Sequence, residues 1–442
     1  MALDLSRYQR SLNQLNPMRI SGRVVQVIGL TIEAVGLDCQ IGEVCKIQTR
    51  RDEVVLSEVV GFRNSTTLLM PLGDMEGIQP DSQVYPQGTV FRAPVGNELL
   101  GRVLDGIGDP IDSGSPLGDL QTMAINNSAP HPMERQIIKE PLVTGVRAID
   151  GMLTCGKGQR MGIFAGSGVG KSTLMGTIAR SSRSDVSVIA LIGERGREVR
   201  DFVEKDLGPE GLKRSVVVVS TSDKPALLRL KAAYVAMTIA EYFRNEGLDV
   251  TFLMDSVTRF AMAQREVGLA IGEPPASRGY TPSVFALLPK LLERAGTGKC
   301  GSITGYFTVL VEGDDFNEPI CDAVRSILDG HIILSRQLAT RNHYPAIDVL
   351  GSISRVMPTI TSPEHRNWAA KSRRLLATYE KARDLINIGA YVAGSDPEID
   401  EAIAFMPQLN NFLLQGREFS SFESTLLQLG AMGNTGEYID AA

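Results

Sequence analysis

The stretch that decides the fold is residues 160–173, which read RMGIFAGSGVGKST. The mostly apolar segment RMGIFA predicts a buried strand, and the segment after the loop, TLMGTIAR, predicts a helix. Between them, glycines allow successive backbone N–H groups to point at one phosphate, and the helix N-terminus adds the positive end of its dipole. A strand, a glycine-rich loop and a helix in this order are typical of a phosphate-binding P-loop.

Two side chains of this loop carry the chemistry expected of a nucleotide site. Lys171 can reach the β and γ phosphates, and the Ser172 hydroxyl can ligate Mg²⁺. The first position of the pattern is Ala165 rather than glycine, which is a modest departure from the strict form. We expect ATP contacts along the whole loop, from Ala165, Gly166, Ser167, Gly168, Val169, Gly170, Lys171, Ser172 and Thr173.

Two carboxylates follow other predicted strands. Glu194 comes directly after VSVIALIG, and Asp255 ends VTFLMD. Because ligands of open α/β sheets bind beyond the carboxyl ends of the strands, both should face the P-loop. We expect Glu194 to polarise the attacking water and Asp255 to hold Mg²⁺ through a water. The structural alternatives are a surface ion pair for Glu194 and a helix N-cap role for Asp255. We expect Glu198 and Arg259 just behind the site.

The chain changes character along its length. Residues 18–92 consist of short β-branched segments separated by Gly, Asp and Asn, which predicts a small barrel or sandwich. Residues 93–345 alternate strands with helices, which implies a parallel sheet covered on both faces. Residues 346–442 read as a helical domain, with no strands expected after about residue 346. The predicted fold class is therefore an α/β P-loop core with an N-terminal β-barrel and a C-terminal helical domain.

Some local signals are more specific. Residues 1–17 place Leu5, Tyr8, Leu12 and Leu15 at helical spacing, which fits either a docking helix or a frayed terminus. In the C-terminal part, Gly389 is expected to end a long amphipathic helix, and Asp396-Pro397 to begin the next as N-cap and first helical residue.

The bulk composition excludes several classes of protein. The 442 residues carry a net charge of −6, which argues against a nucleic-acid-binding surface but does not exclude a local basic patch. No apolar run is long enough for a membrane span, and the N-terminus lacks the apolar core of a secretory signal. The five cysteines include no CxxC pair, which favours free thiols in a reducing cytoplasm. We therefore expect a cytoplasmic protein that binds no nucleic acid.

Once these residues are aligned, the chain resembles a known family. The segments GIFAGSGVGKST, ALIGERGREVRDF, LMDSVTRFAMAQREVGLAIGEPP and NHYPAIDVLGSISRVM are similar to those of rotary-ATPase alpha/beta subunits. The resemblance is strongest to the ATPases of type III protein export, first the flagellar branch and second the virulence-injectisome branch. It spans roughly residues 18–435.

The resemblance assigns roles to further residues. Arg355, in SISR, matches the arginine finger that reaches into a neighbouring subunit's site, and Tyr344, in HYPAID, matches the aromatic residue against adenine. Glu194 matches the catalytic glutamate of the GER motif, and Arg195 of the same motif is included among the ATP contacts. Arg355 as a structural ion-pair residue and Tyr344 as core packing remain the alternatives.

The resemblance also implies a function with Mg²⁺ as cofactor of ATP hydrolysis. Six copies would form a ring that energises the export of flagellar proteins, and the expected location is the inner face of the cytoplasmic membrane. The implied partners are export chaperones, exported proteins, a central coiled-coil stalk, a membrane export gate and a stator-like negative regulator. We place the regulator's contact on residues 1–17.

Three other functions compete with this interpretation. A catalytic subunit of a rotary ATP synthase shares the motifs, but the DELSEED sequence of its helical domain is absent here. An RNA translocase would need exposed aromatic and basic residues on its barrel, and residues 18–92 contain few aromatics. A subunit that binds nucleotide without turnover would not need Glu194.

Overall fold

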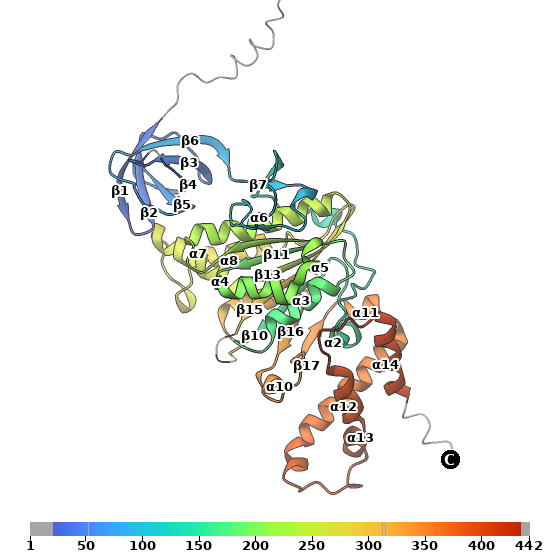
Figure 1. Ribbon diagram of the computed structural model, residues 1–442. Coiled ribbons are helices and arrows are strands. Elements are labelled where there is room, and N and C mark those ends of the chain that lie inside the picture. The colour runs from blue at the N-terminus through green and yellow to red at the C-terminus, as the bar shows by residue number, and fades with distance from the viewer. Residues whose placement is uncertain (1–20, 52, 312, 314, 435–442) are drawn as a thin grey trace, which may run out of the picture. The chain divides into compact units, whose positions relative to one another are not determined.

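The computed structural model describes residues 21–51, 53–311, 313 and 315–434. These residues form two compact units, shown in Figure 1. The first consists of the chain up to Phe91 with two short later segments, residues 225–228 and 266–274. The second contains the rest of the described chain, including the helical C-terminal part. The expected N-terminal segment, residues 1–17, lies outside the described residues.

The first unit is a closed β-barrel. Val24, Ile32, Ile47, Leu69 and Val84 point inward and are almost fully buried, as the alternation of apolar and polar residues along each strand requires. Antiparallel pairing closes the barrel in the order β1 (Gly22–Ile28), β2 (Thr31–Val35), β5 (Thr66–Pro71), β4 (Val54–Arg63), β3 (Glu43–Gln48) and β6 (Gln83–Val90). The predicted N-terminal barrel is confirmed.

The second unit is built on a mainly parallel sheet. Its apolar strands are buried on both faces, because helices cover both sides of a parallel sheet. The strand order is β17 (Ile347–Ser354), β16 (Gly330–Leu334), β10 (Arg160–Ala165), β15 (Ser302–Leu310), β13 (Asp249–Asp255), β11 (Val186–Ile192), β12 (Ser215–Ser220) and β8 (Val103–Leu104). A short strand, β14 (Gly296–Thr297), pairs with β15, and β7 (Arg92–Val95) pairs with β9 (Gln121–Ala124) in a separate ribbon.

The helices of the strand–helix part of the chain follow the strands, as the predicted alternation requires; residues 226–228 and 266–271 of these helices belong to the first unit. They are α2 (Arg147–Met152), α3 (Lys171–Ser181), α4 (Gly196–Asp201), α5 (Gly208–Lys213), α6 (Ala226–Asn245), α7 (Val257–Ile271), α8 (Pro282–Leu292), α9 (Pro319–Ile327), α10 (Arg336–Thr340) and α11 (Met357–Ile360). A π-helical segment, Phe202–Leu207, joins α4 to α5. No helix in the described ranges is both long and apolar enough to cross a lipid bilayer.

The sheet continues beyond the point where we expected strands to end. β17 (Ile347–Ser354) pairs antiparallel with β16 and forms an edge of the sheet. An edge strand is only half covered, so its sequence, IDVLGSIS, mixes apolar with polar residues and lacks the apolar run of the central strands. The core sheet therefore ends at Ser354, later than the boundary after residue 345 that the sequence suggested.

The C-terminal part is helical, as expected. It consists of α12 (Pro363–Asn387), α13 (Pro397–Leu413) and α14 (Phe422–Asn434), drawn in orange to red in Figure 1. Gly389 has a φ of 70°, the left-handed conformation that ends a helix, and Asp396 accepts hydrogen bonds from the N–H groups of Glu398 and Ile399. Both predicted helix ends are confirmed.

Candidate functional site

The P-loop, Glu194 and Asp255 lie at one edge of the core sheet. β10, β13 and β11 are parallel, so their carboxyl ends lie along the same side of the sheet. We call this side, which is formed by strand ends, the nucleotide edge. After β10, Gly168 and Gly170 adopt φ values of 78° and 89°, and α3 begins at Lys171. Residues with a Cβ atom adopt such positive φ values only at a cost in free energy, which explains why glycine occupies both positions of the loop.

Lys171 lies between the two predicted carboxylates. Its Nζ bonds to Oδ1 of Asp255 and lies 3.8 Å from Oε1 of Glu194. The three side chains are 13%, 6% and 12% exposed, so water screens their charges only weakly. The fold thus brings together three side chains from separate segments of the chain, and their types are those expected for phosphate binding and hydrolysis.

Glu194 has the ionisation behaviour expected of a base. Burial, the nearby Asp255 carboxylate and Glu198 raise its pKa to about 7, although Lys171 acts in the opposite direction. Its Oε1 atom is buried and accepts no hydrogen bond from the described residues. A pKa near neutrality and a free acceptor allow Glu194 to take a proton from an attacking water.

Asp255 does not cap the helix that follows it. The Ser256 hydroxyl accepts the hydrogen bond from the Arg259 N–H at 3.3 Å and so caps the first turn of α7. The carboxylate of Asp255 instead accepts a hydrogen bond from Oγ1 of Thr308 at 2.7 Å, besides its bond to Lys171. Thr308, which was not among the predicted site residues, orients Asp255 through this hydrogen bond.

A pocket of about 370 Å³ opens beside the P-loop. Tyr344 is 39% exposed and its ring lies against Gly170, so it is available for stacking rather than being part of the core. The pocket is lined by Val146, Gly168, Gly170, Thr173, Leu174, Thr177, Tyr344, Pro345, Gln415, Gly416 and Arg417. Its position and mixed lining suit a purine ring whose phosphates lie in the P-loop.

The segment that closes this pocket, residues 414–418, was not expected from the sequence. Gln415 holds it in place: its backbone N–H donates to the Tyr344 carbonyl at 2.9 Å, and its buried side chain bonds Gly145 and Arg147 at 2.7 and 2.8 Å. In the sequence these residues resemble any loop that follows a helix. Their place at the pocket becomes evident only from the contact between Gln415 and Tyr344 in the folded chain.

Arg355 lies at the other end of the strands. β17 runs antiparallel, so Arg355 follows its end next to the start of β16, and the Arg355 N–H donates to the Asp329 carbonyl. Asp329 in turn bonds the backbone of Arg160, where β10 begins. At about 3.3 Å per residue, the length of β10 separates Arg355 from the P-loop by roughly 16 Å. Arg355 therefore cannot serve the site of its own chain in this conformation.

The other predicted residues surround the site. Glu198 ion-pairs with Arg195 at 3.5 Å on the exposed first turn of α4, and the Arg195 side chain is 80% exposed. Arg259 packs against Gly193, next to Glu194. Contact of Arg195 with ATP stays a prediction, because its side chain does not line the pocket.

Three family models match the chain in succession. Residues 24–88 match the beta-barrel domain of the ATP synthase alpha/beta family, and residues 145–354 match its nucleotide-binding domain. Residues 361–431 match the T3SS EscN ATPase C-terminal domain. The nucleotide-binding match ends at Ser354, which agrees with the end of the core sheet.

Whole-length relatives give the same answer. A flagellum-specific ATP synthase of Bacillus subtilis is 57% identical over 90% of this chain and 91% of its own length. A type 3 secretion system ATPase of Xanthomonas euvesicatoria is 52% identical over 95% of each chain. The assembled ATPase EscN of enteropathogenic E. coli superposes with a TM-score of 0.89 at 48% identity, covering 93% of this chain and 100% of EscN. The chain belongs to the ATP synthase alpha/beta family, in the branch of ATPases that serve type III export.

Proposed function

We propose that this chain hydrolyses Mg-ATP in a homohexameric ring and that this energises type III export of flagellar proteins. The observation that carries the proposal is the separation of two half-sites. Lys171, Glu194 and Asp255 occupy the nucleotide edge, whereas Arg355 occupies the opposite edge of the same sheet. A ring that joins the two edges of successive copies would complete every site with one kind of subunit.

The nucleotide edge supports the chemistry of hydrolysis. On nucleotide binding, Lys171 would exchange a carboxylate partner for the β and γ phosphates. Glu194 would then accept a proton from the attacking water, for which its raised pKa suits it. Arg355 of the neighbouring copy would balance charge that develops on the γ phosphate, the role for which a guanidinium fork is suited.

The residues at this edge fit a magnesium ion that arrives with ATP. Ser172 presents an exposed hydroxyl at the first turn of α3, and Asp255 presents a buried carboxylate that Thr308 orients. No group of three or more His, Cys, Asp and Glu side chains in the described part of the chain could bind a metal by itself. Mg²⁺ keeps several waters and takes few protein ligands beside phosphate oxygens, so one hydroxyl and one carboxylate fit its needs. When bound, the ion would neutralise charge between the β and γ phosphates.

The proposed partners follow from the family. The relatives' names favour flagellar export, and EscN has been solved with its central stalk EscO. We therefore propose a stalk protein in the ring's centre, together with chaperones and exported proteins as cargo. A membrane export gate and a regulator bound to residues 1–17 complete the proposal, and they imply a cytoplasmic location at the membrane surface. If deletion of residues 1–17 left regulator binding unchanged in a pull-down, that contact would be abandoned.

The experiment that tests shared sites is a mixing assay. The ATPase rate per protomer is measured against protein concentration for the wild type, for Glu194→Gln, for Arg355→Ala and for mixtures of the two variants. Activity that rises with concentration and partly returns on mixing supports sites shared between identical copies. Flat activity without complementation would contradict the homohexamer and favour a second kind of subunit, as in the rotary synthases.

The flagellar assignment needs a cellular test. Deleting the gene should abolish flagellar filaments and swimming, and a plasmid copy should restore both. The Glu194→Gln copy should fail to restore them, while accumulating at the wild-type level in an immunoblot. Normal motility in the deletion strain, with loss of secretion by a virulence system, would transfer the protein to the injectisome branch.

A further inference from the structure

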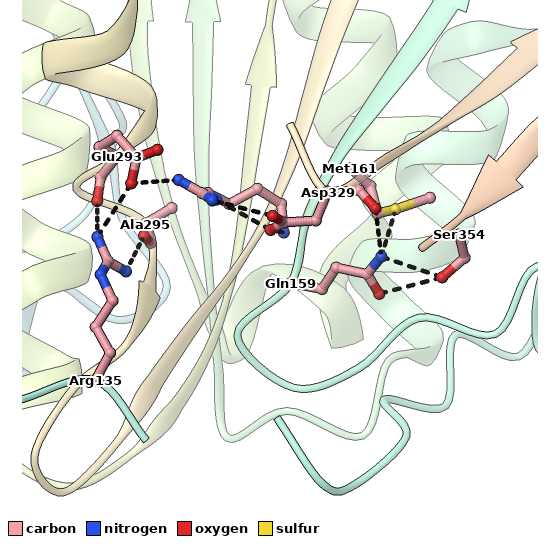
Figure 2. A network of polar contacts seen from close by, with 8 residues as sticks. Arg135, Gln159, Met161, Glu293, Ala295, Asp329 and Ser354 are labelled. Atoms are coloured by element: carbon pink, nitrogen blue, oxygen red, sulfur yellow. Dashed lines mark hydrogen bonds and ion pairs between the residues drawn. The ribbon is translucent and has the colours of Figure 1, made fainter. Parts of the chain in front are cut away.

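The edge of the sheet that carries Arg355 also contains a network of polar side chains, shown in Figure 2. We call it the finger network. It joins the start of β10 to the turn before β16, to the end of β17 and to the segment after α8. Its members are Arg135, Gln159, Arg160, Glu293, Asp329 and Ser354.

The network holds the backbone of Arg355 directly. The Arg355 N–H donates to the Asp329 carbonyl at 3.1 Å, and Nε2 of Gln159 donates to the same carbonyl at 3.3 Å. The Asp329 N–H donates to the Arg160 carbonyl at 2.9 Å. Arg355 is thus fixed to the beginning of β10, the strand that leads to the P-loop.

Gln159 links the residues on either side of this anchor. It is fully buried, and its Nε2 donates to Oγ of Ser354 at 3.1 Å while its Oε1 accepts from the Gly156 N–H at 2.8 Å. The Ser354 hydroxyl also accepts from the Met357 N–H at 3.3 Å. A buried amide is costly unless its donors and acceptors are bonded, so these contacts are made together or not at all. They hold Ser354, which directly precedes Arg355, and Met357, which follows it by two residues.

Three ion pairs hold the network from outside. Nε and Nη2 of Arg160 each lie 3.0 Å from a carboxylate oxygen of Asp329, and Nη1 pairs with Glu293. Arg135 donates to Oε2 of Glu293 at 3.4 Å and to the Ala295 carbonyl at 3.0 Å. Planar forks bonded at two points restrict the direction of each partner as well as its distance.

The side chain of Arg355, unlike its backbone, is not held by the network. It is exposed, and none of the described residues binds its guanidinium through a hydrogen bond or an ion pair. A fixed backbone beneath a free guanidinium is what a group needs if it is to meet a ligand held by another molecule. Misplacement of such a group by about 1 Å can cost two orders of magnitude in rate.

We propose that Gln159 is a positioning residue for Arg355, which it holds, through Ser354 and the Asp329 carbonyl, where the guanidinium meets the nucleotide of a neighbouring copy of this chain. The proposal rests on the proposed function, because it requires Arg355 to act on a neighbour's site. It predicts that substituting Gln159 lowers ATPase activity when the substitution is on the chain that supplies Arg355. The same substitution should have no effect on the chain that supplies the nucleotide site.

The test uses full-length chains in the mixing assay. Glu194→Gln donates only the finger, and Arg355→Ala donates only the nucleotide site. Gln159→Leu is introduced into one or the other before mixing. We expect about tenfold less restored activity when it is on the Glu194→Gln chain, with an unchanged KM for ATP. On the Arg355→Ala chain it should leave the restored activity as it was.

Each other result has a definite meaning. Equal loss on both chains would show general damage and overturn the positioning role, as would no loss on either. If the parent mixture restores nothing, the proposed shared site fails first, and the role of Gln159 falls with it. Thr251→Val, placed on the finger-donating chain, is the matched control, because Thr251 is a buried, hydrogen-bonded side chain in β13 that contacts Ser182 and Ser184.

A second variant keeps the test decisive if Gln159→Leu does not fold. Ser354→Ala removes the hydroxyl between Gln159 and the Met357 N–H while making no change to the amide. It should show the same dependence on the chain that carries it, with a smaller loss of about threefold, since the Asp329 carbonyl still holds the Arg355 backbone. An equal effect on both chains would overturn the proposal.

Discussion

The two edges of the core sheet carry charged clusters that are balanced differently. At the nucleotide edge, the single ammonium of Lys171 faces two carboxylates, Glu194 and Asp255. At the opposite edge, two guanidinium groups in the finger network face two carboxylates. The first cluster is short of positive charge and suits an incoming cation, whereas the second is neutral within itself. One edge is therefore arranged to react and the other to hold its shape.

Substitution of Arg355 should reduce activity most, because none of the described residues pairs with its guanidinium. Arg355→Ala should lower kcat by about three orders of magnitude, because an arginine finger stabilises charge only in the transition state. The free energy of unfolding of the isolated variant chain should lie within about 0.5 kcal/mol of the wild-type value, because the Arg355 side chain is exposed and contributes little to the stability of its own chain. Steady-state ATPase assays and thermal melts measure the two quantities. A large loss of stability would place Arg355 among the structural residues instead.

Glu194→Gln is the corresponding test of the nucleotide edge. The amide keeps the shape but cannot accept a proton, so kcat should fall by about two to three orders of magnitude. Binding of ATP should persist, because Lys171 and the P-loop are unchanged, and a fluorescent ATP analogue measures its Kd. The control is Glu204→Gln, an exposed glutamate that pairs with Arg200 away from the pocket. Unaltered turnover in Glu194→Gln would revive the interpretation as a binding subunit without catalysis.

Removing Arg160 should lower the stability of the fold, because Arg160 pairs with two carboxylates of the finger network. Burial disfavours the charge of Arg160, but the hydrogen bonds that it donates to Asp329 and Glu293 more than offset this and raise its pKa. Arg160→Leu leaves two partly buried carboxylates without this partner, at a cost of about 2 kcal/mol in the free energy of unfolding. Urea titrations measure it, with Arg200→Leu on the exposed helix α4 as the control. An unchanged midpoint would show that the network contributes no stability.

The pH profile should report the imbalance at the nucleotide edge. Burial and Asp255 raise the pKa of Glu194 to about 7, so the carboxyl group loses its base function below that pH. The value of kcat/KM for ATP, which reflects the free enzyme, should fall about tenfold per pH unit below 7 and level off above it. A stopped assay in constant-ionic-strength buffers measures the profile. The residual activity of Glu194→Gln should lack this limb, and a limb that survives the substitution must belong to another group.

The sequence predicted more of the nucleotide edge than of the opposite edge. Lys171, Glu194 and Asp255 each follow an apolar strand, so their shared position followed from the topology of a parallel sheet. Gln159 and Asp329 stand in short polar turns, and nothing in their own segments shows that a strand distant in sequence lies beside them. β17 was missed for a related reason, because a half-covered edge strand lacks an apolar run.

The segment that closes the nucleotide pocket, residues 414–418, was also not predicted from the sequence, and its substitution should have only a weak effect. Gln415→Leu removes the side-chain hydrogen bonds to Gly145 and Arg147, so residues 414–418 should lie less firmly over Tyr344. The KM for ATP should rise about threefold to tenfold with an unchanged kcat, since this contact is made equally to the ground and transition states. Gln428→Leu, on α14, is the control. A fall in kcat instead would mean that the segment helps to place the γ phosphate, and the nucleotide edge would then extend into the C-terminal domain.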